Sequence, residues 1–318
     1  QNELTNNILS FWLPCCVDEE YGGFLNCFDN SGERLLSRDK YTWSQGRFVW
    51  LWSKLADMEG DTFTAPERAH FHALAKNGFD FLRRHCLIAP DDFRCVFLME
   101  ADGTPKNVSG YDALDLSIYA DCFVIAGFAR YALTAQEPSA WAFALRLYQS
   151  VVHRIRAGSF NTLPCPLAPG YRAHGIPMIL THGTTELYKT AKQFDIAAAS
   201  MLAGDLRSYA VDILDNFVDA EDVLHEIVSA DNKFLDNPLG QHINPGHTLE
   251  DMWFLLDAAQ LLGETGWLER IAGIVQKTMA LGWDDEYGGI FHFAPTGPGM
   301  LDRDAGELEA DPTLRLVR

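Results

Sequence analysis

Apolar residues at helical spacing are the feature that most limits the fold of this chain. They recur at intervals of three and four residues in segments that lie within residues 71–82, 145–155, 206–217 and 271–279. This spacing places apolar side chains on one face of an α-helix. The alternation typical of strands is hard to find outside two Tyr-Gly-Gly segments. The pattern therefore predicts an all-α chain built from many antiparallel helix pairs.

The connections between these segments indicate how the helices are grouped. Residues 89–92 and the stretch from Pro164 to Pro177 are rich in turn formers. No Ser/Gly linker or break in composition divides the chain, so we expect one domain over residues 1–318. In such a domain the functional residues are expected in the loops at one end.

The two Tyr-Gly-Gly segments form an internal echo. An acidic run precedes Tyr21-Gly22-Gly23 near the start of the chain, and another precedes Tyr287-Gly288-Gly289 near its end. A Gly-Gly pair marks a tight turn between short extended pieces. The two copies are either one loop type used twice in a repeating layout or two unrelated hairpin turns.

Charge and cysteine usage exclude some classes of partner. The chain has 25 basic and 44 acidic residues and a net charge of −19, which repels phosphate backbones and makes nucleic acid an unsuitable partner. We find no apolar run long enough to span a bilayer and expect no membrane partner. The seven cysteines are scattered without a Cys-x-x-Cys pair, which is typical of reduced thiols and predicts a cytoplasmic protein.

The segment from Asn244 to Phe254 is the strongest candidate for chemistry. Asn followed by Pro is a helix start, because Asn caps the helix and Pro fits its first position. His247 then lies in the first turn, with Glu250 three residues on and close enough to hydrogen-bond the imidazole. The positive end of the helix dipole favours a neutral imidazole, which is a usable general base. The alternative is a capped surface helix without a catalytic role.

A second candidate segment carries aromatic residues around an arginine. Trp43, Arg47 and Trp50 lie at helical spacing on one face. Stacked rings and a planar guanidinium suit sugar hydroxyls or a carboxylate. A core-facing aromatic stripe is the alternative, which we prefer for Trp50, whereas Arg47 is costly to bury without a partner. Tyr119 lies in an apolar helix and either points into a cavity or packs in the core.

Two histidines near a turn complete the candidates. His174 and His182 flank the start of a helix that contains Met178, and each is either a pocket residue or a structural one. No cluster of Cys and His has zinc spacing, so we expect no metal site. We also find no phosphate-binding glycine loop and no Gly-x-Ser-x-Gly nucleophile turn.

With these segments in hand, the chain resembles the N-acylglucosamine 2-epimerase family. The match rests on the first Tyr-Gly-Gly loop with residues 40–50, on Asn244-Pro-Gly-His-Thr-Leu-Glu250, and on residues 283–293, with Leu224-His225-Glu226 as a further family segment. The resemblance implies an (α/α)6 barrel in which Arg47, Tyr119 and His247 converge on a sugar. Trp43, Met178 and His182 are the other substrate-binding residues that we expect. Pro177-Met178 favours the N-acylglucosamine branch over the isomerases, whose histidine pattern His182 misses by one position.

Family members continue to a Trp-Trp-x-x-x-Glu helix and a second catalytic histidine, which we do not find before Arg318. We therefore expect the C-terminal helices of the barrel to be missing from this sequence.

The resemblance implies a reaction as well as a fold. We expect interconversion of N-acetylglucosamine and N-acetylmannosamine, with His247 moving the proton at C2, Glu250 orienting His247, and Arg47 holding the sugar or polarising O1. No cofactor is required, although the family allows ATP as an allosteric activator and a homodimer as the assembly. The alternatives are an aldose–ketose isomerase of the mannose/fructose type, a non-catalytic protein-binding member, and a glycoside hydrolase, which would need two spaced carboxylates.

Overall fold

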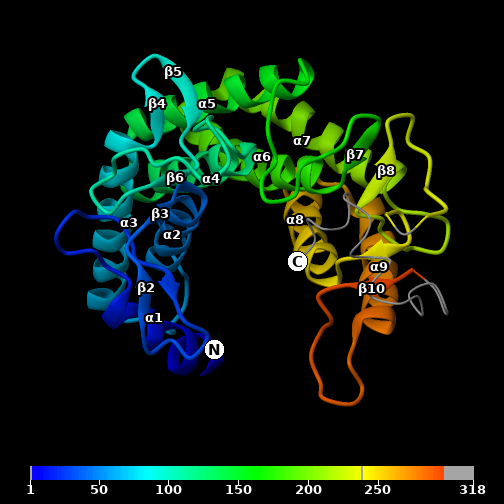
Figure 1. The fold of residues 1–318 in the computed structure, drawn as a ribbon, viewed down its shortest axis with the longest axis horizontal. Helices are drawn as coiled ribbons and strands as arrows, with labels where there is room; N and C mark the ends of the chain where they lie inside the picture. The colour runs from blue at the N-terminus through cyan, green and yellow to red at the C-terminus, as the bar shows by residue number, and fades with distance from the viewer. Residues whose placement is uncertain (1, 238, 297–318) are drawn as a thin grey trace. The chain divides into compact units, whose positions relative to one another are not determined.

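The computed structural model describes residues 2–237 and 239–296, and most of this part of the chain is helical (Figure 1). The α-helices are α1 (Leu9–Cys15), α2 (Thr42–Ala56), α3 (Ala65–His85), α4 (Ile118–Ala135), α5 (Pro138–Arg156), α6 (Gly175–Phe194), α7 (Ile196–Asn216), α8 (Pro245–Leu262) and α9 (Leu268–Gly282). A π-helix (Glu3–Ile8) precedes α1, and a 3₁₀ turn (Thr265–Trp267) precedes α9. The four segments with helical spacing lie in α3, α5, α7 and α9, except for Phe217, which directly follows α7, so the all-α prediction is confirmed.

The strands are short and pair two by two in antiparallel fashion. The pairs are β1 (Cys27–Phe28) with β2 (Leu35–Ser37), β3 (Lys40–Tyr41) with β6 (Leu98–Met99), β4 (Leu87–Ala89) with β5 (Asp92–Cys95), β7 (Tyr171–Ala173) with β8 (Ile227–Ser229), and β9 (His242–Ile243) with β10 (Ala294–Pro295). The sequence pattern missed most of them because strands of two to four residues are too short to show alternation.

The described residues fall into two compact units. Unit 1 comprises residues 2–163 and 186–199, and unit 2 comprises residues 164–185 with the described residues from 200 onward. Helices α6 and α7 each contribute to both units. That residues 1–318 form one domain stays a prediction.

In unit 1, helices α2 and α4 cross at two glycines. A β-carbon on Gly46 would lie 2.5 Å from the backbone carbonyl carbon of Phe123, and one on Gly127 would lie 2.6 Å from the carbonyl oxygen of Gly46. Only glycine permits backbones to approach this closely. The crossing therefore fixes the N-terminal half of α2 against α4, and it places Arg47 beside Phe123.

Helix α4 is the apolar centre of unit 1. Contrary to the sequence expectation, its 18 residues are long and apolar enough, by length and composition, to cross a membrane. Most of the helix is buried inside the structure, and a buried core helix has the same composition. Asp121, its one acidic residue, is buried and bonded at 2.6 Å to Arg154 of α5.

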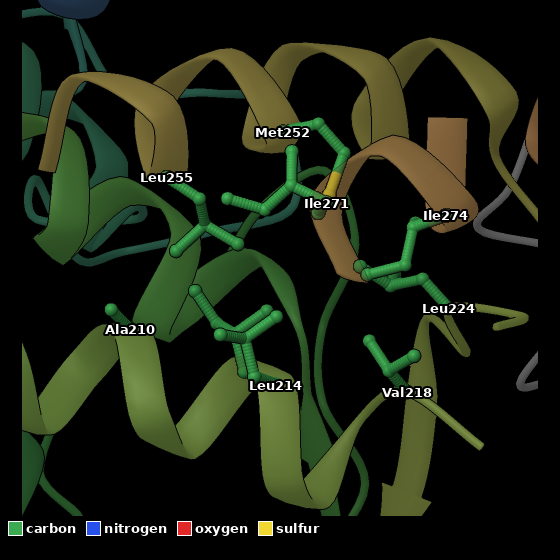
Figure 2. Close-up of a cluster of buried hydrophobic side chains, with 9 residues drawn as sticks. Ala210, Leu214, Val218, Leu224, Met252, Leu255, Ile271 and Ile274 are labelled. Carbon is green, nitrogen blue, oxygen red and sulfur yellow. The ribbon is translucent and has the colours of Figure 1, made fainter. Parts of the chain in front are cut away.

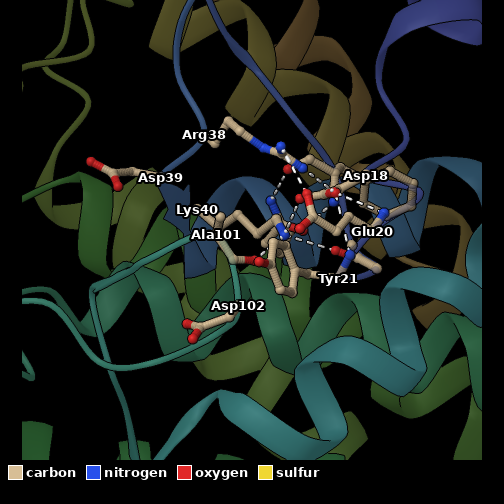
Figure 3. A network of polar contacts seen from close by, with 12 residues as sticks. Asp18, Glu20, Tyr21, Arg38, Asp39, Lys40, Ala101 and Asp102 are labelled. Atoms are coloured by element: carbon tan, nitrogen blue, oxygen red, sulfur yellow. Dashed lines mark hydrogen bonds and ion pairs between the residues drawn. The ribbon is translucent and has the colours of Figure 1, made fainter.

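A buried lysine pins the first Tyr-Gly-Gly loop of unit 1 (Figure 3). Nζ of Lys40 donates to Oδ2 of Asp18 and to the carbonyl of Gly22, each at 2.8 Å, and to the carbonyl of Ala101. Arg38 donates to the other oxygen of Asp18 at 2.7 Å. Burial alone would raise the pKa of the Asp18 carboxyl, but Lys40 outweighs it and holds the pKa low. The buried charges are thus paired and satisfied, which is the condition for their burial.

The second Tyr-Gly-Gly loop, in unit 2, repeats this backbone geometry. Oδ1 of Asp18 accepts the amides of residues 20 and 21, and Oδ1 of Asp284 accepts those of residues 286 and 287. The amide of the first glycine donates to the carbonyl of the aspartate in both copies, at 2.8 and 2.9 Å, and all four glycines have positive φ. The echo is therefore one loop type used twice.

The core of unit 2 holds α8 against α7 and α9 (Figure 2). Met252 and Leu255 of α8 pack with Ile271 and Ile274 of α9 and with apolar residues of α7 and the turn that follows it. These side chains are at most 3% exposed. Their burial fixes the rotation of α8 and with it the direction of the side chains in its first turn.

Candidate functional site

The first turn of α8 carries His247 and has the cap that the sequence predicts. Oδ1 of Asn244 accepts the backbone amide of His247 at 3.1 Å, and Pro245 occupies the first helical position. The carbonyl of Asn244 also accepts the amide of Thr248 at 3.0 Å. This cap fixes the backbone of His247. Its side chain is 49% exposed, so a solute can reach the ring.

Glu226 holds the imidazole of His247. Its Oε2 lies 3.2 Å from Nδ1 of His247. Because an ionised carboxylate only accepts hydrogen bonds, Nδ1 carries a proton and donates it. The remaining nitrogen, Nε2, then has the lone pair that can take a proton from a substrate.

The partner of His247 differs from the one expected from the sequence. Glu250 makes no hydrogen bond to the imidazole in the described residues and influences His247 through charge alone. Spacing on the helix suggested Glu250, but the cap and the core turn the ring toward the strand that follows Glu226. The prediction that Glu250 orients His247 by a hydrogen bond is therefore wrong.

The expected charge preference of His247 is also reversed. Burial lowers the pKa of the imidazole, but the hydrogen bond and charge of Glu226 outweigh burial and raise the pKa above its ordinary value of 6.5. The helix N-terminus alone would have favoured the neutral ring. A raised pKa makes the imidazole a stronger base toward a substrate proton.

The antiparallel pairing of β7 with β8 brings a second histidine to Glu226. Ala173 pairs with Ile227, and the amide of His174 donates to the carbonyl of Glu226 at 2.8 Å. The side chain of His174 is completely buried. Its Nδ1 lies 3.8 Å from Oε1 of Glu226, within ion-pair distance.

Asp251 faces the other side of His174. Its Oδ2 lies 2.9 Å from Nε2 of His174, and both side chains are fully buried. Asp251 lies four residues after His247 on α8, so the two project from the same face of the helix. The four side chains thus form one row, Asp251–His174–Glu226–His247, from the interior of unit 2 to its surface.

The charges alternate along this row. Burial opposes a charge on His174, but Asp251 and then Glu226 outweigh it and raise the pKa of the imidazole to about 10. Burial also opposes the charge on Glu226, yet the two histidines hold the pKa of its carboxyl well below the usual range. Burial raises the pKa of Asp251, with His174 acting against it. At neutral pH the row holds a cationic His174 beside a carboxylate that is always ionised.

Only part of this row can be predicted from the sequence. Glu226 lies within a segment that resembles the family, and His174 lies near a predicted helix start. Asp251 was not singled out, although its position four residues after His247 was a usable signal.

The other candidates of unit 2 lie on α6. Met178 is 6% exposed, and its amide donates to the carbonyl of His174 at 3.1 Å. The ring of His182 is buried and stacks on Phe254 of α8, with centroids 4.4 Å apart and planes inclined by 21°. This favours a packing role for His182 within unit 2. That either residue binds substrate stays a prediction.

The candidates of unit 1 gather at the N-terminal ends of α2 and α4. The guanidinium carbon of Arg47 lies 3.8 Å from the ring centroid of Phe123, within the distance of a cation–π contact. Tyr119 precedes Phe123 by one helical turn, and Trp43 precedes Arg47 by one turn. Trp43 packs edge-on against Phe97 at 5.3 Å. That these residues converge with those of unit 2 on one sugar stays a prediction.

Within residues 2–237 and 239–296, no group of three His, Cys, Asp or Glu side chains has an arrangement that could hold a metal ion. All seven cysteines lie in this range, and none forms a disulfide.

Comparison with protein families and curated proteins gives a consistent match. Residues 22–304 match the family model described as N-acylglucosamine 2-epimerase (GlcNAc 2-epimerase). The chain is 30% identical over 295 residues to the N-acylglucosamine 2-epimerase of Rattus norvegicus and 29% identical over 294 residues to that of Homo sapiens. These alignments cover 91% of this chain but only 66% and 65% of the two relatives. The chain thus spans just under two thirds of the length of these relatives.

Solved structures share the fold. A sugar epimerase from a ruminal bacterium superposes with a TM-score of 0.72 at 18% identity, over 93% of this chain and 74% of that one. The cellobiose 2-epimerase of Bacillus thermoamylovorans superposes with a TM-score of 0.71 at 16% identity, over 92% and 76% of the two chains. Together with the helices described above, these matches confirm the expected all-α fold of the (α/α)6 class.

Proposed function

The chain belongs to the N-acylglucosamine 2-epimerase family, and we propose that it interconverts N-acetylglucosamine and N-acetylmannosamine by removing and returning the proton at C2. The observation that carries this proposal is His247, a half-exposed imidazole on a capped helix with its Nδ1 held by Glu226. Nε2 is then the nitrogen aimed at a substrate proton. The family match and the curated relatives support the choice of an N-acyl sugar.

The chemistry of C2 fits a base of this kind. The C2 proton of the open-chain sugar is next to the C1 aldehyde, so its removal gives an enolate with charge on O1. As Nε2 takes the proton, the ring becomes a cation, and the Glu226 carboxylate at 3.2 Å stabilises that charge. Glu226 also fixes the tautomer, as the carboxylate partner of a catalytic histidine does in other enzymes.

Inversion at C2 needs two further groups. A second acid–base group must act on the opposite face of C2, and the family resemblance implies a second histidine for it. A donor must stabilise O1 or hold the sugar, and we assign this role to Arg47 of unit 1. Its cation–π contact with Phe123 places the guanidinium fork in advance. We also propose that ATP acts as an allosteric activator, and this proposal rests on the family resemblance alone.

Hydrogen exchange tests the proposal directly. The protein, expressed with its complete natural coding sequence, is incubated with N-acetylmannosamine in D₂O and followed by NMR. We expect deuterium at C2 together with N-acetylglucosamine, and a loss of about 10²- to 10⁴-fold in exchange for His247→Gln, as for removal of a general base. The exposed His70 of α3 provides the control His70→Gln, which should exchange like the wild type.

The alternatives give different results in the same assay. Deuterium at C1 with formation of a ketose would identify an aldose–ketose isomerase. Absence of exchange in the wild type would favour a binding protein. Wild-type exchange in His247→Gln would remove this residue from the mechanism.

A further inference from the structure

The buried pair of His174 and Asp251 has no role in the steps above, although it lies directly behind Glu226. We propose that His174, anchored by Asp251, is a positioning residue that fixes the Glu226 carboxylate and thereby holds His247 as the Nδ1-protonated tautomer. This inference rests on the proposed function and adds two residues to its machinery. Neither of them touches substrate in the mechanism given above.

The geometry explains why Glu226 needs a second partner. A carboxylate with one hydrogen bond can rotate about its last torsion, which is broad in energy. In unit 2 one oxygen of Glu226 faces His247 at 3.2 Å and the other faces His174 at 3.8 Å. The backbone bond from His174 to Glu226, 2.8 Å long, sets the spacing of the two side chains. Both oxygens of the carboxylate therefore have a partner, His247 through a hydrogen bond and His174 through an ion-pair contact.

The anchor of His174 is equally specific. Nε2 of His174 lies 2.9 Å from Asp251, and neither side chain has exposed surface. A buried ion pair of this kind is weak evidence for a gain in stability, because desolvation costs about as much as the attraction returns. Orientation of an active group is a better reason for such a pair, as with the outer partners of metal-binding histidines.

Burial keeps other charges away from this row. The ring of Phe217 packs against His174 with centroids 6.0 Å apart. The guanidinium of Arg172 lies 5.1 Å from the centroid of the Phe217 ring and is paired with Asp212 at 2.5 Å. The thiol of Cys165 is near enough to Glu226 for the carboxylate to add to the rise in its pKa that burial causes.

The titratable groups that bear on the row are therefore few. In the described residues, Asp251 and Glu226 act on His174, and His174, Glu226 and His247 act on Asp251. His174, His247 and Cys165 lie near Glu226, and Glu226, His174 and Glu250 act on His247.

Removal of the His174 charge has a defined effect on the pH profile. His174 lowers the pKa of both Glu226 and His247. Proton abstraction needs a neutral Nε2, and Glu226 stays ionised, so activity is lost on the acid side as His247 takes a proton. In His174→Gln both pKa values rise, and the acid limb of kcat/KM moves to higher pH. We expect kcat to fall by about 10- to 100-fold with little change in KM.

A single substitution leaves the buried Asp251 without its partner, so the test uses a second variant. The double variant His174→Gln with Asp251→Asn replaces the ion pair by two neutral amide side chains of similar size. It should recover stability relative to the single variant but keep the shifted acid limb. His225 provides the matched control, because it is another histidine of unit 2 that lies 2.9 Å from a carboxylate, Asp219, and does not face His247. His225→Gln should lower the melting temperature and leave the acid limb in place.

A readout without substrate separates this inference from the proposed function. In histidine-labelled protein, ¹⁵N NMR should show one Nδ1-protonated tautomer for His247, assigned by its loss in His247→Gln. The double variant should show a mixture of tautomers. An unchanged tautomer together with an unchanged acid limb in the double variant would overturn the inference. A His174-dependent tautomer in a protein without C2 exchange would support the positioning and sink the epimerase proposal.

Discussion

Replacement of Glu226 by Gln tests the core of the proposed site, because the two side chains have the same shape and differ in charge. The hydrogen bond from Nδ1 of His247 to Oε2 of Glu226 is 3.2 Å long and joins a carboxylate that is 12% exposed to an imidazole that is 49% exposed. A hydrogen bond to a charged group contributes about 1.5–3 kcal/mol. Because water reaches the imidazole, we take the lower end of this range, which corresponds to a loss of about tenfold in kcat.

The direction of the pH effect is fixed by the sign of the interaction. Glu226 is the group that raises the pKa of His247 against the effect of burial. In Glu226→Gln that pKa falls, so the neutral imidazole persists to lower pH and the acid limb of kcat/KM moves down. The shift is opposite to the one expected for His174→Gln. General damage to the fold cannot move the limb in two directions.

The assay is the rate of C2 exchange as a function of pH, measured by NMR in D₂O for wild type and variant. Glu226→Asp keeps the charge but shortens the reach by one methylene and should lose rate without a downward shift of the limb. Asp219→Asn removes the matching carboxylate beside His225 and serves as the control. An acid limb at the wild-type pH in Glu226→Gln would refute the role given to Glu226.

Three further predictions concern other parts of the molecule. Arg47→Lys keeps the charge but loses the planar fork and its contact with Phe123, so kcat/KM should fall about tenfold while the melting temperature changes little; an unchanged kcat/KM would make Arg47 structural. Gly46→Ala places a β-carbon 2.5 Å from the Phe123 backbone and should destabilise unit 1 by about 1–3 kcal/mol in urea unfolding. The control is Gly60→Ala, because Gly60 has positive φ but no atom within 4 Å of the new β-carbon. It should show only the smaller cost of its backbone conformation. The pKa of His174 is raised from 6.5 to about 10, so its contribution to stability is complete below pH 6.5 and is lost as the pH rises through about 10. The melting temperature of the wild type should therefore fall more steeply between these pH values than that of the double variant at His174 and Asp251.

The sequence by itself determined the helices and the start of α8. Helical spacing of apolar residues is a local property, and each of the four periodic segments became a helix because one face could be buried. Asn244 and Pro245 act within one turn, so the cap and the place of His247 followed from residues next to one another. The echo of the two Tyr-Gly-Gly loops was also readable, because an aspartate and two glycines with positive φ define that turn locally.

Only the tertiary structure decided which residue holds the imidazole. Glu250 is the carboxylate that lies near His247 on the helix, but Glu226, 21 residues before His247, is the one that reaches its Nδ1. The pairing of β7 with β8 brings Glu226 and His174 together from segments 52 residues apart, and the packing of α8 turns His247 and Asp251 toward them. Such contacts depend on strand register and helix rotation. Both are set by the burial of distant apolar side chains, and no local spacing encodes them.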